Sequence, residues 1–532
     1  MIETENAPAV SPRPSQFWQS YFGPRPEKFV YYGIAVVAAY ALLRSTFYAV
    51  FKPLWFDEIL TAIVSRQGSL AGIQAALKQG IDGNPPAFYL AEHWAASLIP
   101  NEFIGYRLLS ILAFACTLLC VFGFVKTRYG SLVALLSSAL LLITPLFTLY
   151  AEEARPYSLV VALIALALVC YQRAPRPLWT FGLALSLALA ALLHYYALLS
   201  FAPFFLAEMA FLYFTRRFRF SVWLALLIPL LPVGLSFPRL MWMKQNWGTH
   251  FWYGAALSDV SAAYGDYFRI GSLWGVALFG ITLLMLFVSL SPLFSRSDST
   301  EPLLPALLAE HALVTGLIAL PLLGFAVAKV SHGPFTERYL LATILGFIFA
   351  SALPLSKASP AALRTVAALL LFALCSQELG FWKSLKNRQT VATIIAPLVE
   401  LAKVPDYGDL PIVFSDAGIY VEIWHYAPPE LFSRAVALPD PATAVAYTDT
   451  DTVDKLVLAL RPYAPAGIQH FDDFIGAHPR FLLYSNGSRA DWWPARLAHD
   501  GYRVQRLYSR APNIAYVVDA PPAKTAADTM LR

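Results

Sequence analysis

The sequence predicts a multi-pass α-helical membrane protein that ends in a small α/β domain. Hydrophobic residues make up 58% of the 532 residues, charged residues only 14%, and the mean hydropathy is +0.55. A soluble globular protein carries roughly 25% charged residues. Apolar runs of membrane-spanning length, about 20 residues, recur between residues 29 and 380. After residue 381 the apolar runs shorten to strand length, which separates a second region.

We expect about eleven spans, because that many apolar runs are long enough to cross a bilayer. They cover residues 29–50, 104–125, 130–150, 156–172, 177–194, 197–215, 221–239, 271–292, 304–327, 338–356 and 360–380. The polar N-terminal residues 1–28 lack the basic-then-apolar design of a cleaved signal, so we expect them to form a cytoplasmic tail.

With the N-terminus in the cytoplasm, the basic clusters fall in the inner loops, as the positive-inside rule requires. These clusters are Lys126 and Arg128; Arg173 and Arg176; Arg216, Arg217 and Arg219; Arg296; and Lys357 and Arg364. The net charge of +5 is small and lies mostly in such clusters. It indicates topology determinants rather than a nucleic-acid surface. The cysteines lie in apolar runs without metal-ligand spacing, so disulfides and zinc are not predicted.

The same topology collects the unusual polar sequences on the outer side. They are the first outer loop (residues 52–103), the turn Glu152–Tyr157, His194–Tyr196, the loops Arg239–Ile270 and Lys329–Arg338, and the region 381–532. In the first loop, apolar spacing predicts short helices at Ile59–Gln67, Leu70–Gln79 and Phe88–Leu98. Asp82–Pro86 is a breaker cluster that predicts a turn. Such convergence indicates a single extracytoplasmic site.

Region 381–532 has the composition of a small α/β domain. It predicts strands at Pro411–Ser415, Phe481–Tyr484, Tyr502–Tyr508 and Ile514–Val518, and a helix at Trp492–His499. Thr443–Thr448 is ambiguous between helix and strand. The region contains neither a Gly-rich phosphate loop nor a metal-ligand cluster.

Asp57 and Glu58 form an acidic pair behind Trp55 and Phe56, where the first span ends. Carboxylates are costly beside hydrocarbon, so a pair at this border is a candidate functional site. Glycosyl transfer needs a base to take the acceptor proton, which a carboxylate supplies. The alternatives are a solvated span end, or a helix N-cap made by Asp57.

The turn Glu152–Tyr157 joins two spans with almost no linker. Acidic residues and Pro156 suit the start of a helix, which accounts for part of the motif without any function. That account leaves Arg155 and Tyr157 unexplained. A guanidinium at the headgroup level is well matched to a phosphate, so Arg155 is a candidate phosphate ligand, with Glu153 beside it.

Three further outer segments carry candidate ligands. His194 could donate to a phosphate or bind a metal, whereas Tyr195 and Tyr196 also fit an interfacial aromatic belt. Lys329, His332 and Arg338 bring positive charge to an outer loop, which suggests an anionic ligand; a lipid headgroup contact by Arg338 is the alternative. The loop Trp242–Tyr253 fits either an interfacial belt or a platform for sugar stacking. Within spans, Arg44 is expected to snorkel outward, and Glu208 to be a structural residue that is paired or faces the cytoplasm.

These motifs resemble a known family in their order and spacing. The run Trp55–Glu58, the segment Asp82–Pro86 with Tyr89 and His93, and Tyr106–Ser110 resemble the dolichyl-phosphate-mannose-protein mannosyltransferase-like family. So do Glu153–Tyr157 and Arg338–Tyr339. That family belongs to the GT-C membrane glycosyltransferases and includes the bacterial aminoarabinose transferases of lipid A. The similarity covers about residues 30–350.

The resemblance implies a GT-C-like fold and inverting transfer from a polyprenyl-phosphate sugar. It makes Asp57 the catalytic aspartate and Glu153 a second acid, with Arg155 and Arg338 as candidates for the lipid phosphate. To these we add Glu58, which with Glu153 would orient the acceptor or a metal, and Lys329 and His194 as further phosphate ligands. We expect Tyr157, Tyr195, Asn84 and His93 to bind substrate. The large soluble insertion of the protein O-mannosyltransferases is missing. Ile59 stands where the aminoarabinose enzymes have threonine, so lipid A is not assigned as acceptor.

The sequence therefore predicts an integral-membrane glycosyltransferase of the bacterial inner membrane, with its site and C-terminal domain outside the cytoplasm. Its partners would be a polyprenyl-phosphate sugar, membrane lipids, and an envelope lipid, glycan or protein acceptor. No cofactor is assigned, and dependence on a divalent metal ion stays open. The alternative function is a transporter or flippase of a lipid-linked saccharide, which predicts discontinuous spans and polar groups at mid-membrane depth.

Overall fold

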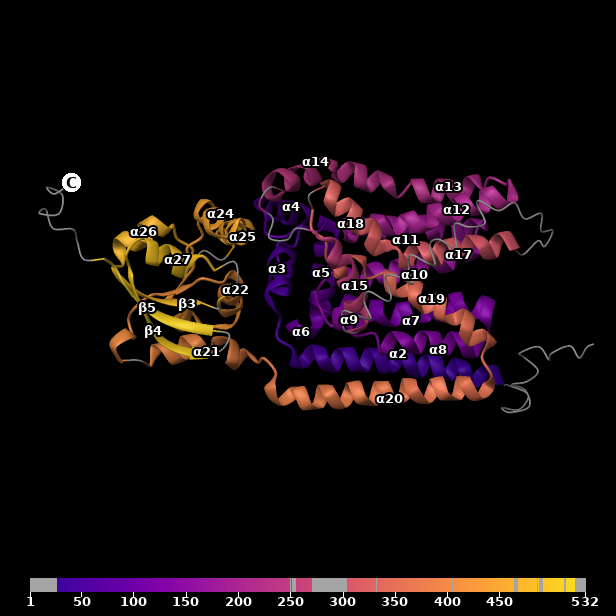
Figure 1. Ribbon diagram of the computed structural model, residues 1–532, viewed down its shortest axis with the longest axis horizontal. Coiled ribbons are helices and arrows are strands. Elements are labelled where there is room, and N and C mark those ends of the chain that lie inside the picture. Colours follow the sequence, from indigo (N-terminus) through magenta and orange to yellow (C-terminus); the bar gives the residue numbers. More distant parts are fainter. Residues whose placement is uncertain are drawn as a thin grey trace, which may run out of the picture.

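The computed structural model describes residues 26–248, 250, 255–269, 304–331, 333–403, 405–463, 467–485, 487, 491–510 and 513–521. The described part is mostly helical: a bundle of long helices joins a small α/β domain at one end (Figure 1). Short helices of the first outer loop lie between the two. The predicted span at 271–292 and His332 lie outside the described residues.

The bundle contains the apolar segments that the hydropathy pattern predicts. Its helices are α2 (Pro26–Phe51), α7 (Leu108–Tyr129), α8 (Ser131–Leu142), α9 (Pro145–Tyr150), α10 (Tyr157–Arg173), α11 (Pro177–Leu193), η1 (Tyr195–Phe201), α12 (Ala202–Thr215), α13 (Phe220–Leu227), α14 (Leu230–Trp247), α15 (Leu257–Phe268), α17 (Leu304–Ile318), α18 (Leu320–Ser331), η2 (Glu337–Leu340), α19 (Thr343–Lys357) and α20 (Pro360–Ser384).

The chain is a multi-pass membrane protein. Within the described residues, five helices are long and apolar enough to cross a membrane, and a sixth span would be the pair α17 and α18, which is bent by 53°. Four shorter apolar helices join them. The predicted span 130–150 is divided into α8 and α9, because Pro145 removes a backbone donor and starts a new helix. The number eleven stays a prediction.

The first outer loop folds into four helices: α3 (Phe56–Ser65), α4 (Leu70–Gln79), α5 (Pro86–Leu98) and α6 (Glu102–Gly105). The expected helices and the turn between α4 and α5 are confirmed. The hydroxyl of Ser69 caps α4, and Gly80 ends it with φ +99°, a conformation that glycine adopts without strain. Buried apolar faces on α3 and α4 fix this loop against the bundle.

The C-terminal domain has a five-stranded sheet in the order β2-β1-β3-β5-β4. The strands are β1 (Ile412–Phe414), β2 (Ala435–Val436), β3 (Arg480–Ser485), β4 (Arg503–Arg510) and β5 (Asn513–Asp519); β1 is parallel to β2 and β3, and β5 is antiparallel to β3 and β4. The four predicted strands are confirmed, whereas the two-residue β2 had no sequence signal. Around the sheet lie η3 (Leu385–Asn387), α21 (Val391–Ala402), η4 (Pro405–Tyr407), α22 (Ala417–Tyr426), α23 (Pro429–Phe432), α24 (Pro441–Thr448), α25 (Thr452–Leu460), α26 (Phe471–Ala477) and α27 (Trp493–His499).

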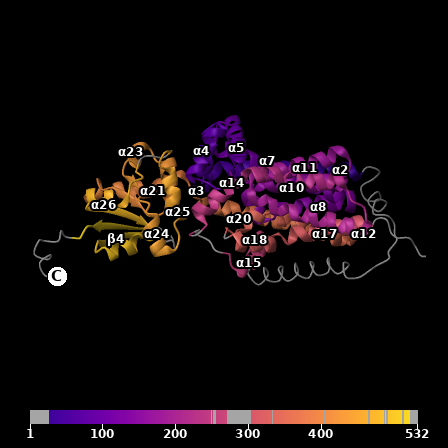
Figure 2. The same cartoon turned by 90° about the horizontal axis from the view of Figure 1, so that it is seen from above.

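The C-terminal domain contacts the first loop and the end of α14 (Figure 2). The hydroxyl of Tyr426 on α22 donates to the carbonyl of Leu54 at 3.1 Å, and His425 lies 3.1 Å from Glu102 of α6. From α25, the ammonium of Lys455 donates to the carbonyl of Asn246. These contacts hold the domain over the end of the bundle where the first loop lies.

Candidate active site

Asp57 lies in the first turn of α3 and faces two arginines. Trp55, not Asp57, is the N-cap of α3, so the capping alternative is wrong. The carboxylate Oδ2 of Asp57 is 3.4 Å from Nη1 of Arg338 and 3.9 Å from Nη2 of Arg155. Its side chain is 17% exposed, so a reactant can reach it. The structure therefore brings together three residues that are 281 positions apart at the extremes.

Arg155 holds the turn between α4 and α5 against α3. Its Nη1 donates to Oδ2 of Asp82 at 2.6 Å and to the backbone carbonyl of Asp57 at 3.3 Å. Burial by itself would raise the pKa of Asp82, but Arg155 and the Gly83 backbone N–H outweigh it and keep that pKa below its ordinary value. Asp82 is thus an ionised anchor for Arg155 at neutral pH.

The arginines of this site keep donors without acceptors. Arg239 of α14 joins Arg155 and Arg338 there, donating from Nη2 to the carbonyl of Asp82 at 3.1 Å. In all three the Nε–H is buried and has no partner in the described structure, and the same holds for Nδ2 of Asn84. Buried donors normally find acceptors, so this arrangement suits a ligand with several anionic oxygens.

The local charge balance also favours an anion. The guanidinium groups of Arg155 and Arg338 face the carboxylates of Asp57 and Asp82, and Arg239 donates to the backbone carbonyl of Asp82. Among these five side chains, three cations against two anions leave one positive charge. Guanidinium groups bind phosphate oxygens in a bidentate manner, so a phosphate is the matching ligand.

Glu58 lies beside Asp57 but in a closed environment. Its side chain and that of Arg107 are both fully buried, with Oε2 2.6 Å from Nη2 and Oε1 2.7 Å from Nε. Oε1 also accepts from the backbone N–H of Ala154 at 2.7 Å. Burial alone would raise the pKa of Glu58, but Arg107 and Lys52 hold it below its ordinary value. Glu58 therefore joins α3, α7 and the Glu152–Pro156 turn, and the alternative that it belongs to a solvated span end is wrong.

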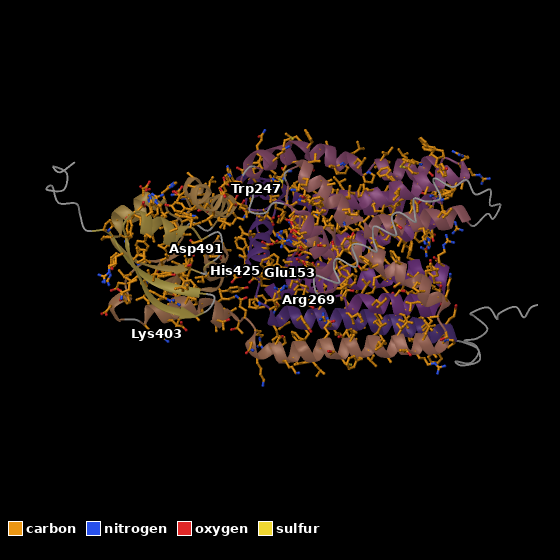
Figure 3. The ribbon with its side chains drawn as sticks, viewed as in Figure 1. Glu153, Trp247, Arg269, Lys403, His425 and Asp491 are labelled. Carbon is orange, nitrogen blue, oxygen red and sulfur yellow. The ribbon has the colours of Figure 1, made fainter. Side chains whose placement is uncertain are left out.

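Glu153 and Glu152 are both buried and each faces a cation from α2 or just beyond it. Oε1 of Glu153 is 2.9 Å from Nζ of Lys52, while its Oε2 has no partner in the described structure. Glu152 is 2.7 Å from Nη1 of Arg44, so Arg44 is paired inside the protein instead of snorkelling outward. Figure 3 shows Glu153 at the end of the bundle that adjoins the C-terminal domain.

Burial shifts the protonation of these two acids. It raises the pKa of Glu152 to about 7, against the opposing effect of Arg44. It also raises the pKa of Glu153, where Lys52 opposes the shift and the nearby Glu58 and Asp57 add to it. The anionic charge near Asp57 is therefore smaller than the number of carboxylates suggests.

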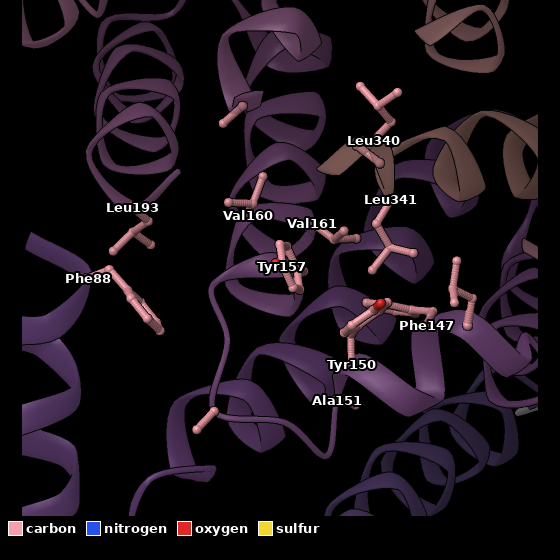
Figure 4. Close-up of a cluster of buried hydrophobic side chains, with 14 of the residues drawn as sticks. Phe88, Phe147, Tyr150, Ala151, Tyr157, Val160, Val161, Leu193, Leu340 and Leu341 are labelled. Atoms are coloured by element: carbon pink, nitrogen blue, oxygen red, sulfur yellow. The ribbon is translucent and has the colours of Figure 1, made fainter. Parts of the chain in front are cut away.

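An aromatic wall lies behind Arg338. The rings of Tyr157, Tyr339 and Tyr196 surround His194, whose centroid is 5.5 Å from that of Tyr157 and 4.9 Å from that of Tyr339. Figure 4 shows Tyr157 among buried apolar side chains that include Val161 and Leu341. Tyr157, Val161, Leu341 and His194 line a small cavity together with Arg338. Arg338 is one of the two arginines that face Asp57. His194 and Tyr157 thus lie near Arg338, and their roles as phosphate and substrate ligands stay predictions.

The other predicted ligands are more scattered. Tyr195 neighbours Arg239 and Ser236 of α14. His93 is half-buried beside Gly68 and Trp94, at the far end of α3 from Asp57. Lys329 is exposed, 5.8 Å from the ring centroid of Phe325, and has no ion pair within the described residues. The structure does not bring Lys329 or His93 to Asp57.

Three residues that sequence reasoning left out of the site belong to it: Asp82, Arg239 and Lys52. Asp82 lies in the predicted turn Asp82–Pro86, but the sequence prediction names Asn84, two residues later, as the substrate ligand. Arg239 and Lys52 sit at the outer ends of predicted spans, where a cation also serves as a topology or headgroup residue. The predicted topology puts all three on the same side, and Asp82 also belongs to a motif that carries the family resemblance.

The site does not suit a divalent metal ion. Asp57 and Asp82 face guanidinium groups, and Glu153 faces an ammonium group, so each carboxylate already has a cationic partner. Among the described residues, no three His, Cys, Asp or Glu side chains lie close enough to share an ion. Binding a metal there would require displacing these cations.

No protein-family model matches the sequence, and no curated protein sequence does either. In fold, the chain is similar to two crystal structures of ArnT from Cupriavidus metallidurans. The apo structure has 12% identity and a TM-score of 0.44, and the structure bound to undecaprenyl phosphate has 13% and 0.39; each covers 91% of this chain and 97% of that one. At these values the similarity concerns only the course of the chain and says nothing about its function.

Proposed function

We propose that the protein is an inverting membrane glycosyltransferase that moves a sugar from a polyprenyl-phosphate donor to an envelope lipid, glycan or protein. The observation that carries this proposal is that Arg155 and Arg338 face the accessible carboxylate of Asp57, and that they and the neighbouring Arg239 have buried Nε–H groups without a partner among the described residues. A base beside a cationic phosphate site is what glycosyl transfer from a phosphate donor requires.

In the proposed reaction an acceptor hydroxyl or amine attacks the anomeric carbon of the sugar. The bond between that carbon and the phosphate oxygen breaks, its electron pair leaves with the polyprenyl phosphate, and Asp57 takes the acceptor proton. Arg155 and Arg338 stabilise the charge that develops on the leaving phosphate. A single displacement inverts the configuration.

The contact lengths support these separate roles. Arg155 is held tightly by Asp82 at 2.6 Å, whereas Asp57 lies 3.4 and 3.9 Å from its arginines, beyond ordinary charge-assisted hydrogen bonds. The two guanidinium groups therefore orient the Asp57 carboxylate without forming short hydrogen bonds to it. A phosphate entering between the arginines would leave this carboxylate free to accept a proton.

The proposed site is extracytoplasmic, at the outer surface of a bacterial inner membrane. Lys126 contacts Tyr31 near the start of α2, whereas Lys52 and Glu153 lie at its other end. The basic cluster and the carboxylates thus mark opposite ends of the bundle, and the positive-inside rule puts the basic end in the cytoplasm. The C-terminal domain then lies outside.

The test is product formation by the purified full-length protein. Polyprenyl-phosphate sugars carrying a radiolabelled sugar are incubated with the protein and with lipid, glycan and protein fractions of source membranes. We expect a labelled glycoside and release of the polyprenyl phosphate, which chromatography resolves. Failure of every labelled donor to react with any acceptor fraction would refute the proposal.

A transporter of lipid-linked saccharides is the second candidate, because the bent pair α17 and α18 is a discontinuous span. The break is apolar, and the carbonyl of Ile318 there accepts from the hydroxyl of Tyr264 at 2.8 Å. It lacks the charged substrate contacts that transporter breaks present. Movement of labelled lipid across liposomes without a glycoside product would favour this candidate.

A further inference from the structure

The helix α15 is amphipathic and buries two tyrosines. Its buried positions recur at helical spacing, and they include Val260, Ala263, Tyr264 and Tyr267, whereas Asp266 is exposed. The helix packs against α9, α18 and η2, and Figure 2 shows it beside α18. α15 itself carries no residue of the proposed active site, but η2 carries Arg338.

The hydroxyl groups of both tyrosines face backbone carbonyls in irregular segments. Tyr264 donates to the carbonyl of Ile318 at 2.8 Å, at the bend between α17 and α18. The hydroxyl of Tyr267 lies 3.2 Å from the carbonyl of Glu337 and 3.3 Å from that of Leu340, the two ends of η2. Carbonyls at helix ends and bends lack helical partners, so a buried donor stabilises them. Of these two segments, η2 is the one with a residue that faces Asp57.

The guanidinium group of Arg338 is held loosely by its own contacts. Its Nη1 is 3.4 Å from Asp57, and its Nε has no hydrogen-bond partner among the described residues. The ring centroids of Tyr157 and Tyr339 lie 5.8 and 5.6 Å from its Cζ. Because these contacts are long, the place of the guanidinium group depends on where the backbone of η2 is held.

Contacts from three neighbouring elements hold η2. It is a short 3-10 helix, whose internal hydrogen bonds are poorer than those of an α-helix. Tyr196 of η1 donates to the carbonyl of Pro334, ahead of η2, and Leu340 packs so closely on Gly324 of α18 that a Cβ there would overlap it. The contact from Tyr267 of α15 reaches carbonyls on both sides of Arg338.

We infer that Tyr267 is a positioning residue for Arg338, and that its hydroxyl group holds η2 so that the guanidinium group faces the leaving phosphate beside Asp57. The inference rests on the proposed function. Tyr267 is fully buried and acts on the reaction through the backbone of η2, not by touching the donor. Misplacing a group by about 1 Å from a distant site can lower a rate about a hundredfold.

The test compares two substitutions on the same helix. Tyr267→Phe removes the hydroxyl group and keeps the ring, and Tyr264→Phe is the matched control, because both tyrosines are fully buried and both hydroxyl groups face backbone carbonyls. The full-length proteins in detergent are compared by thermal unfolding, by undecaprenyl phosphate titration and by kcat and KM for the labelled donor. Hydrogen exchange of the peptide that contains η2 is followed by mass spectrometry.

We expect Y264F and Y267F to lower the unfolding midpoint by similar amounts, since each leaves buried carbonyls without a donor. In Y267F, but not in Y264F, kcat should fall about tenfold to a hundredfold. The loss of undecaprenyl phosphate affinity should be smaller than the loss of kcat, because Arg338 acts most on the charge that develops in the transition state. Hydrogen exchange at η2 should be faster in Y267F alone.

Arg338→Gln shows whether Tyr267 acts through Arg338. If it does, adding Y267F to R338Q should cause no further loss of turnover or of undecaprenyl phosphate affinity. Two independent residues would instead lose the same factor in either background.

Wild-type turnover in Y267F, an equal loss in Y264F, or the full further loss on top of R338Q would each overturn the inference. The proposed function fails in a different way: R338Q would bind undecaprenyl phosphate like wild type, or no labelled donor would react. Hydrogen exchange needs no donor and then decides whether Tyr267 holds the segment of Arg338. Equal exchange at η2 in Y264F and Y267F would show that it does not.

Discussion

Asp57 and Glu58 are neighbours in the chain and occupy opposite environments. Glu58 is fully buried and bound by Arg107 and the backbone of Ala154, whereas Asp57 is partly exposed and only loosely faced by Arg155 and Arg338. Both sit in the first turn of α3, where the side chains of successive residues diverge by about 100°. The carboxylate of Glu58 therefore stabilises the fold, whereas that of Asp57 stays accessible for chemistry.

The comparison shows how the buried Glu58–Arg107 pair holds the accessible site around Asp57 in position. Glu58 accepts from Ala154, and the hydroxyl of Ser110 donates to the carbonyl of Arg155. Arg107, at the start of α7, also donates to the carbonyls of Ala49 and Pro53. The loose contacts around Asp57 are thus positioned by a tight network that no reactant needs to enter.

The largest expected effect comes from breaking the closed pair. Arg107→Met leaves the buried charge of Glu58 without its partner, which costs about 3–5 kcal/mol. We expect poor expression or a strong drop in the thermal unfolding midpoint of the detergent-solubilised protein. Restoring balance with Glu58→Leu in the same chain should recover part of the loss. An unchanged midpoint in the single variant would contradict a closed Glu58.

A smaller effect should follow from removing Arg155, which faces the accessible carboxylate of Asp57. Arg155→Gln removes a phosphate ligand and frees Asp82, a charged hydrogen bond worth about 1.5–3 kcal/mol. We expect donor binding to weaken about tenfold to a hundredfold, measured by undecaprenyl phosphate titration. Unfolding should shift less than in Arg107→Met. Wild-type donor affinity in this variant would remove Arg155 from the phosphate site.

Glu92 sharpens the contrast, because it is a buried glutamate that lacks the partners of Glu58. On α5 it is fully buried, and both its oxygens lack partners in the described structure. Burial, and then the charge of Glu58, raises the pKa of Glu92 well above its ordinary 4.5. The folded protein therefore keeps this proton while the unfolded chain releases it, and stability falls as pH rises above about 4.5.

Glu92→Gln should remove that pH dependence. At pH 5 the variant and wild type should unfold at nearly the same temperature, since both carry a neutral side chain of similar shape. At pH 8 the variant should be the more stable by a few degrees, and its transfer activity should stay close to wild type. A pH-independent difference between the two proteins would show that Glu92 is ionised in the folded state.

The smallest effect is expected at an exposed pair. Arg66 and Glu102 lie 2.7 Å apart, but their side chains are 48% and 34% exposed. Arg66→Ala should change stability by at most about 0.5 kcal/mol, as is usual for surface ion pairs. A larger loss, read from the same thermal scans, would mean that Glu102 depends on Arg66 to dock His425 of the C-terminal domain.

The local sequence pattern predicted the helices and strands well, because hydrophobic periodicity and helix-breaking residues act over a few residues of the chain. The helix Leu70–Gln79 was predicted to the residue, and Asp57, Arg155 and Arg338, which the predicted topology puts on one side of the membrane, do meet. The pairing of Glu58 with Arg107 could not be predicted, since 49 residues separate them and nothing local selects that partner.

The sequence was least informative where a side chain's direction decides its role. Asp82 and Asn84 flank Gly83 in one turn, and only the fold shows that Asp82 faces Arg155. Lys329 and Arg338 share one predicted outer loop, yet Arg338 meets Asp57 and Lys329 is exposed on α18. Pro145 divides a predicted span, a break that hydropathy alone averages away.

The most direct test of the central claim is the transfer rate of Asp57→Asn, measured alongside its thermal unfolding and its affinity for undecaprenyl phosphate. Asparagine has nearly the same shape but cannot take a proton at neutral pH. We predict that turnover falls about 100-fold to 10,000-fold while folding and donor affinity stay close to wild type. Turnover near the wild-type rate would contradict Asp57 as the catalytic base.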